Sequence, residues 1–259
     1  MRGQIRSEGL KLRTVWSTWL IIAIAVALTI LLGLVVAFLH PDRGNVENFL
    51  QPLRGSARWF DNVFSTMDVS EDLTLVLGIL CVTGEYRHKT VTPTYLAQPH
   101  RGQVTVAKLA VSALGGLVVA LAVGAAGLAF GAVLVGVGNG TAGVMLGQYG
   151  KVIPGVLGAA VLFAVYGVGL GAVLKNQVVA IVVGIGFSAI IEPIVEGVAP
   201  QVAKYLPGYA AQALSGSAAR GISRLIPLLT WWEGTVILLA YGAVFAVAGS
   251  LTTLRADVT

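Results

Sequence analysis

Charged side chains are scarce in this sequence. Lysine, arginine, aspartate and glutamate together make up 11% of the 259 residues, whereas a soluble domain carries about 25%. Apolar residues make up 56%, and the mean hydropathy is +0.84. This shortage of charge excludes an ordinary water-facing surface and predicts a protein whose solvent is lipid.

Cysteine and histidine are also rare. The single cysteine, Cys81, lies inside an apolar run, which excludes an internal disulfide and predicts a small buried side chain. The three histidines, His40, His88 and His100, lack the spacing of metal ligands. We therefore expect no metal site.

Complete nucleotide-binding motifs are missing. Gly150-Lys151 is similar to the end of a phosphate loop, but Met145 stands in place of its first glycine. Val152 replaces the Ser or Thr that would hold magnesium. We expect a chain without a catalytic site or cofactor of its own. The net charge of +5 does not indicate nucleic acid, because the basic residues cluster beside apolar segments.

Long apolar runs are abundant. A helix needs about 20 apolar residues to cross a bilayer, and continuous runs are typical of helices, since barrel strands alternate. We predict an all-α membrane protein, one domain over residues 1–259, with six transmembrane helices. The predicted spans are residues 19–39, 63–84, 109–137, 152–174, 178–198 and 234–254. An even number places both termini on one side, and the excess of lysine and arginine there predicts the cytoplasm.

The second predicted span carries acidic residues. Reaching across the bilayer from Gly84 requires the stretch that contains Glu71 and Asp72, and the fifth predicted span contains Glu192. Carboxylates inside a span face water or a partner. They either line a transport pathway or are solvated in an outer vestibule. Phe187 could narrow such a pathway or pack against another span. Pro193 weakens helical hydrogen bonding and predicts a local bend.

The predicted cytoplasmic face contains two informative segments. Residues 1–18 predict an amphipathic helix along the membrane plane, with charges at Arg6, Glu8, Lys11 and Arg13; the alternative is charge that only sets topology. Residues 85–101 are dense in polar and charged side chains, and are either a coupling loop or a solvated loop. On the other side, residues 199–233 predict short interfacial or re-entrant helices.

Several short motifs resemble type-2 ABC exporter permeases of actinobacteria. They are Ser7-Glu8, Lys11-Leu12-Arg13-Thr14, Ser17-Thr18-Trp19, Ala107-Lys108-Leu109, Tyr205-Leu206-Pro207, Leu254-Arg255 and, above all, Gly84-Glu85-Tyr86-Arg87-His88-Lys89-Thr90. The last is similar to the coupling motif of that family, with Lys89 where a glycine is usual. Ala256 stands where many relatives have a second arginine.

The resemblance implies a permease subunit in a bacterial plasma membrane that moves a lipophilic or amphipathic substrate outward. It implies a second copy or close homologue as partner and two separate ATPase subunits, which would bind ATP and magnesium. Residues 1–18 would form the elbow helix and residues 199–233 an external gate. The implied ATPase contacts are Glu85, Tyr86, Arg87, His88, Lys89, Thr90 and Arg101. Two alternatives stay open: an ion- or proton-coupled carrier, and a non-transporting membrane scaffold or immunity protein.

Overall fold

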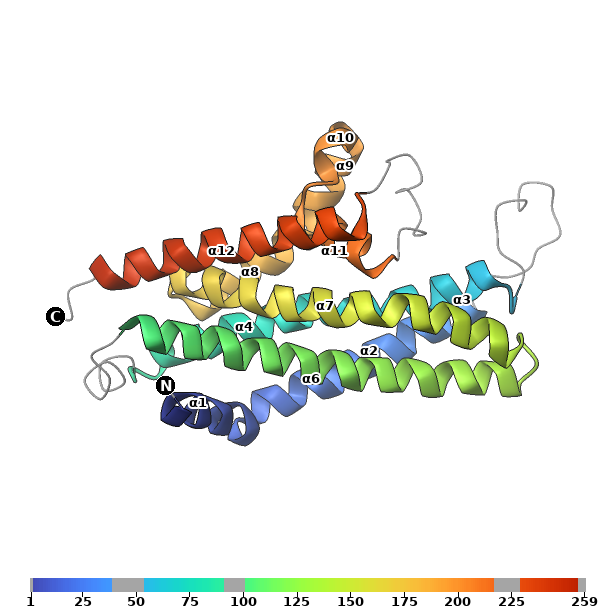
Figure 1. The fold of residues 1–259 in the computed structure, drawn as a ribbon, viewed down its shortest axis with the longest axis horizontal. Helices are drawn as coiled ribbons and strands as arrows, with labels where there is room; N and C mark the ends of the chain where they lie inside the picture. Colours follow the sequence, from blue (N-terminus) through green and yellow to red (C-terminus); the bar gives the residue numbers. More distant parts are fainter. Residues whose placement is uncertain (1, 39–53, 91–100, 217–228, 256–259) are drawn as a thin grey trace.

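The computed structural model describes residues 2–38, 54–90, 101–216 and 229–255, with backbone alone for residues 2–6, 11, 101 and 250–255. Within these ranges the chain is helical and contains no strand (Figure 1). The helices are α1 (Arg2–Thr14), α2 (Trp16–Phe38), α3 (Ala57–Phe64), α4 (Val69–Arg87), α6 (Arg101–Gly136), α7 (Ala142–Leu174), α8 (Gln177–Gly186), α9 (Glu192–Val198), α10 (Pro200–Ala203), α11 (Pro207–Ser215) and α12 (Trp231–Arg255). A 3₁₀ turn, η2 (Ser65–Asp68), joins α3 to α4, and a π-helical turn, η3 (Phe187–Ile191), joins α8 to α9.

Five helical stretches are long and apolar enough to cross a membrane. They are Trp16–Phe38, Gly102–Gly136, Ala142–Leu174, Gln177–Val198 and Trp231–Gly249. The prediction of an all-α membrane protein is therefore confirmed. The second predicted span, residues 63–84, is also helical. It falls outside the five because α4 carries Glu71, Asp72, Glu85 and Arg87 within 19 residues.

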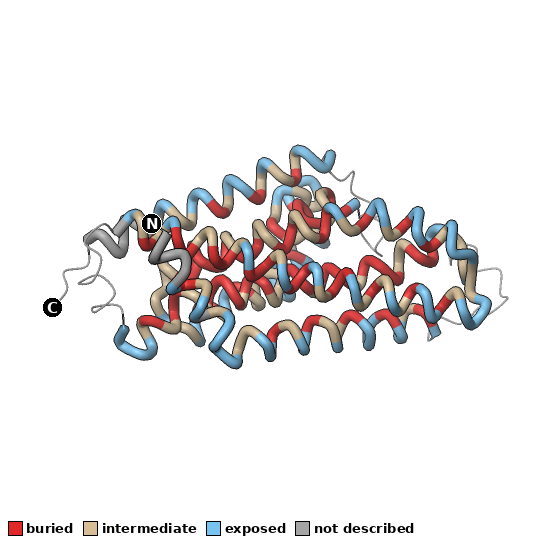
Figure 2. Tube along the Cα trace, turned by 60° about the horizontal axis from the view of Figure 1, so that its bottom comes forward, coloured by how far each residue is buried: buried red, intermediate tan, exposed pale blue. Residues whose placement is uncertain are grey.

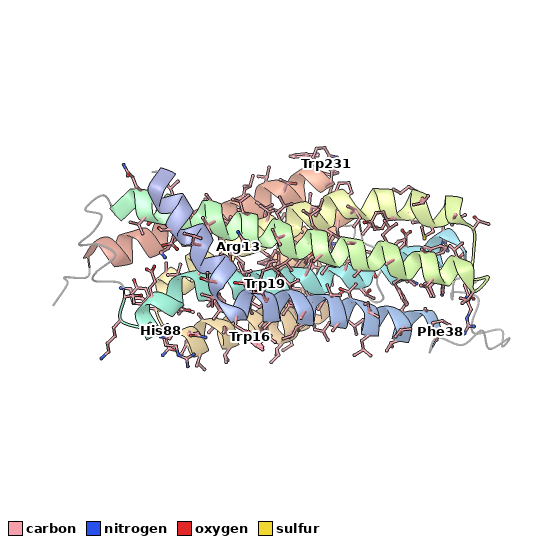
Figure 3. All side chains as sticks on the ribbon, turned by 90° about the horizontal axis from the view of Figure 1, so that it is seen from below. Arg13, Trp16, Trp19, Phe38, His88 and Trp231 are labelled. Atoms are coloured by element: carbon pink, nitrogen blue, oxygen red, sulfur yellow. The ribbon has the colours of Figure 1, made fainter. Side chains whose placement is uncertain are left out.

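The N-terminal helix is shorter than predicted. It ends at Thr14, and Trp16 already begins α2, so the prediction of one amphipathic helix over residues 1–18 is wrong at its C-terminal end. The indole nitrogen of Trp19 donates to the carbonyl oxygen of Arg13 at 3.0 Å and holds this corner together. Figures 1 and 3 show α1 crossing the axis of the bundle near the end where His88 lies, opposite Phe38. We call this the α1 end.

Helix α7 forms the centre of the bundle. It contacts α4, α6, α11 and α12, and 61% of its most apolar 18-residue stretch is buried, against 17% for Gln177–Val198. Figure 2 shows the buried residues concentrated along the middle of the bundle. The apolar face that α8 leaves uncovered is therefore available to lipid or to another chain.

Glycines allow α4 and α7 to approach each other closely. A Cβ atom built on Gly78 would collide with the carbonyl oxygen of Ala164, and one on Gly167 with the carbonyl oxygen of Leu75. Small residues of this kind are typical of closely packed membrane helices. The expectation that Gly167 and its neighbours serve packing is confirmed.

The predicted bend in the fifth span is present as an irregular turn. The π-helical turn Phe187–Ile191 immediately precedes Glu192 and Pro193. Figure 1 shows α9 leaving the direction of α8 and pointing away from the bundle. The chain then forms the short helices α10 and α11, as predicted for part of residues 199–233; residues 217–228 of that segment lie outside the described ranges.

Candidate functional site

Three charged side chains meet at the α1 end of the bundle. Lys108 of α6 places its Nζ 2.7 Å from Oε1 of Glu85 in α4 and 3.2 Å from Oε2 of Glu8 in α1. The same ammonium group lies 3.4 Å from the carbonyl oxygen of Cys81. All three residues are buried, with Lys108 at 6% exposure, Glu8 at 5% and Glu85 at 9%. We call Glu8, Glu85 and Lys108 the ion triad.

The ion triad connects three helices that are distant in sequence. Removing one partner from a buried ion pair costs about 3–5 kcal/mol, because it leaves a buried charge without its counter-charge. The three helices are therefore strongly tied together at this point. A displacement of α1 carries α4 and α6 with it, unless the triad itself breaks.

The end of α4 divides the predicted coupling motif into a buried and an exposed part. Glu85 points into the bundle toward Lys108, whereas Arg87, His88, Lys89 and Thr90 are exposed. Nη1 of Arg87 donates to Oε1 of Gln177 at 3.2 Å and joins α4 to the start of α8. Of the predicted contact residues, the exposed ones form a surface that another protein can reach.

Lys89 adopts the backbone conformation that favours glycine. Its φ is +55°, and the amide nitrogens of Lys89 and Thr90 donate to the carbonyl oxygens of Tyr86 and Glu85 at 3.3 and 2.9 Å. This is the hydrogen-bond pattern of a helix end with a left-handed residue. The departure from glycine noted in the sequence therefore falls at a strained position.

Replacing Lys89 with glycine is expected to preserve or slightly raise stability, and Lys89→Val to lower it by about 1–2 kcal/mol, because a branched Cβ is disfavoured at positive φ. Thermal unfolding and hydrogen exchange at the Thr90 amide measure the effect. Lys175, at φ +54°, is the matched control, since the same two changes there leave the Thr90 amide unaffected. Equal exchange at Thr90 in Lys89→Val and Lys89→Gly would contradict this account of the helix end.

Several predicted contact residues lie outside the described side chains. The backbone of Arg6, Lys11 and Arg101 is helical, but their side chains are not described. Residues 91–100 of the predicted coupling loop lie outside the described ranges altogether. Arg13, the remaining charged residue predicted for the elbow, is exposed.

A second polar cluster lies at the bent part of the fifth predicted span. The hydroxyl of Ser188, in the π-helical turn, donates to Oδ1 of Asp72 at 2.7 Å. The backbone amide of Gly208 donates to Oε1 of Glu192 at 3.0 Å. Gly208 is the second residue of α11, so the Glu192 carboxylate lies at the N-terminus of that helix, where a negative charge is favoured.

The predicted pathway residues are brought together only in part. Asp72 and Glu192 are connected through Ser188, which donates to Asp72 and precedes Glu192 by four residues. Glu71 and Glu192 are each 5% exposed, so simple solvation in a vestibule is wrong for these two side chains. Phe187 begins the π-helical turn and is half-buried.

The segment after α9 adds a hydrogen bond that sequence reasoning missed. The hydroxyl of Tyr209 donates to Oε2 of Glu196 at 2.6 Å. Burial, together with this bond to Glu196, raises the pKa of the Tyr209 phenol. Tyr209 therefore stays protonated and continues to donate at physiological pH.

Metal binding finds no support in the described part of the chain, where no three His, Cys, Asp or Glu side chains gather. Comparison with known proteins gives no further guide to function. No family model matches the chain, and no curated protein matches it.

Proposed function

We propose that this chain is the membrane-spanning subunit of an ATP-driven exporter, similar to type-2 ABC permeases, and that separate ATPase subunits drive it. The observation that carries the proposal is the ion triad beside the exposed residues Arg87, His88, Lys89 and Thr90. A partner that binds this surface contacts the end of α4, and the buried ion triad connects α4 to α1 and α6.

Contacts along α4 support a route for motion through the chain. The helix rises about 1.5 Å per residue, so Asp72 lies roughly 24 Å from His88 on one rigid element. Along that length α4 packs against α7 through Gly78 and Gly167. At the far end of α4, Asp72 accepts a hydrogen bond from Ser188. Glu192, four residues after Ser188, accepts one from the Gly208 amide at the N-terminus of α11.

We infer six spans, with α3, η2 and α4 forming the second and its acids shielded by protein rather than lipid. Both termini are cytoplasmic in a bacterial plasma membrane, and α1 is the elbow helix. A second copy or close homologue covers the apolar face of α8. Two separate ATPase subunits bind ATP and magnesium. Residues 199–233 form the external gate. The cargo is lipophilic or amphipathic.

The proposal is tested at the exposed end of α4. The double variant His88→Glu/Lys89→Glu is expected to reduce the amount of ATPase that co-purifies with the chain by about tenfold. It places two negative charges on the contact surface, and a loss of about 1.4 kcal/mol in binding is a factor of ten in affinity. The amount of the chain in the membrane should stay unchanged, because both side chains are exposed. Mass spectrometry of the detergent-extracted complex measures both quantities.

The matched control is Lys151→Glu, a charge reversal at an exposed residue of α7. It should leave co-purification at the wild-type level. If no nucleotide-binding protein co-purifies with the wild-type chain, or if the double variant retains its full share, ATPase coupling at this surface is refuted.

The buried polar cluster favours one second candidate, an ion- or proton-coupled carrier. Asp72 accepts a hydrogen bond from Ser188, which precedes Glu192 by four residues, and both carboxylates come from helices of the proposed pathway. A carrier works without ATPases. The test is substrate transport by the purified chain alone in liposomes under a proton gradient. Transport that is lost in Glu192→Gln would support the carrier over the exporter.

A further inference from the structure

A cavity of about 510 Å³ opens at the α1 end of the bundle, between α1, α2, α4 and the start of α8. This volume lies in the range of small-molecule sites, about 300–1,000 Å³. Its lining includes the apolar side chains of Leu12, Ile21, Leu77 and Leu80 and the carboxylates of Glu8 and Glu85. Arg87 and His88 line the part nearest the end of α4.

The lining changes from apolar to acidic along α4. Leu77 precedes Glu85 by eight residues, which corresponds to about 12 Å along the helix. The cavity therefore has an apolar part toward the middle of the bundle and a carboxylate part toward the α1 end. A ligand that matches both has an apolar body and one polar group at its end.

The carboxylate part already binds an ammonium group of this chain. Glu8 and Glu85 both contact Nζ of Lys108, and both residues also line the cavity. An ammonium group that enters the cavity meets the same two carboxylates, and burial strengthens charge pairing relative to water. Arg87 and His88 follow Glu85 by two and three residues at the end of α4, on the side away from Leu77 and Leu80 along the chain.

We propose that this cavity binds a lipophilic amine, with the protonated nitrogen beside Glu8 and Glu85 and the apolar body against Leu77 and Leu80. The ligand is either a free amphiphile or an aminolipid of the adjoining leaflet, since both present the same chemistry. The proposed site names a class of cargo for the exporter. Binding of the amine does not depend on the proposed function, but its role as cargo rests on it.

The single cysteine of the chain provides the test without any substitution. Cys81 lines the cavity and is the only thiol in the sequence, so N-ethylmaleimide labelling of the full chain in phosphatidylcholine nanodiscs reports on this cavity alone. Dodecylamine at about four times its Kd is expected to slow labelling about fivefold by mass action. Dodecanol and dodecyl sulfate at the same concentration are expected to slow it less than about twofold.

A second measurement covers the case of slow labelling. A photoreactive dodecylamine should attach to the α4 peptide that carries Leu77–Glu85, and Leu80→Trp, which fills the cavity, should abolish this attachment. The matched control is Leu146→Trp at an exposed position of α7, which should leave it intact. Nanodiscs that contain phosphatidylethanolamine distinguish the two sources of the ligand. If this lipid by itself protects Cys81 from labelling, the ligand is an aminolipid. If only dodecylamine protects Cys81, the ligand is a free amphiphile.

Other outcomes overturn the inference. Equal protection by dodecanol means that the cavity accepts any alkyl chain, and stronger protection by dodecyl sulfate means that Arg87 and His88 select an anion. Attachment that Leu80→Trp does not reduce places the amine elsewhere. None of these results bears on the ATPase. ATP-driven transport without amine binding would refute this site alone, and amine binding without a partner ATPase would refute the exporter alone.

Discussion

Replacing Lys108 with methionine is expected to remove most of the folded chain from the membrane. Methionine keeps the length of the side chain but removes the charge, so Glu8 and Glu85 remain buried beside each other without the ammonium group that both contact. The expected loss of stability is about 3–5 kcal/mol. Fluorescence-detected size-exclusion chromatography of the solubilised chain measures the folded amount, and a thermal series measures the shift in midpoint.

Two further variants separate charge from packing in this experiment. Lys151→Met makes the same change at an exposed residue of α7 and should alter stability by less than about 0.5 kcal/mol. The triple variant Lys108→Met/Glu8→Gln/Glu85→Gln removes all three charges and is expected to recover most of the folded chain. A buried pair is costly to break but not to replace as a whole. If Lys108→Met behaves like Lys151→Met, the ion triad does not hold the helices together.

The helices themselves were predictable because the bilayer imposes a local rule. Every backbone polar group in lipid must be satisfied within the segment, so continuous apolar runs predict helices directly. This rule failed to predict the structure at two places. The acids of α4 keep that helix outside the stretches that qualify by composition, and the break at Val15 is not signalled by any proline or glycine there.

The ion triad was not predictable from the sequence. Lys108 precedes the predicted third span by one residue, so from sequence alone it belongs to the cytoplasmic basic residues that set topology. In the structure α6 begins at Arg101, so Lys108 lies inside a helix and is buried. Its partners come from positions 8 and 85, and only tertiary packing brings them together. The same holds for Ser188 and Gly208, whose contacts with Asp72 and Glu192 depend on the π-helical turn and on α11.

Adding one methyl group to Gly167 is expected to lower stability by about 1–3 kcal/mol, the usual range for overpacking a close contact. The new Cβ of Gly167→Ala would collide with the carbonyl oxygen of Leu75, and backbone cannot rotate away as a side chain can. Gly78→Ala should cost a similar amount through Ala164. Thermal unfolding of the purified variants in one detergent measures both.

Gly158 on the same helix is the matched control. A Cβ there would lie 3.4 Å from Cδ2 of Leu214, an ordinary contact, and alanine favours a helix over glycine by about 1 kcal/mol. Gly158→Ala should therefore be neutral or stabilising, although it makes the same chemical change as Gly167→Ala. If all three variants behave alike, α4 and α7 do not pack backbone against backbone.

The double variant Gly78→Ala/Gly167→Ala distinguishes one shared contact from two separate ones. Both glycines serve the same approach of α4 to α7, so a separation forced by the first methyl group already makes room for the second. We expect the combined loss to be clearly smaller than the sum of the single losses. A strictly additive result would mean that each collision relaxes locally, and α4 would then be free to bend instead of moving as one rigid element from His88 to Asp72.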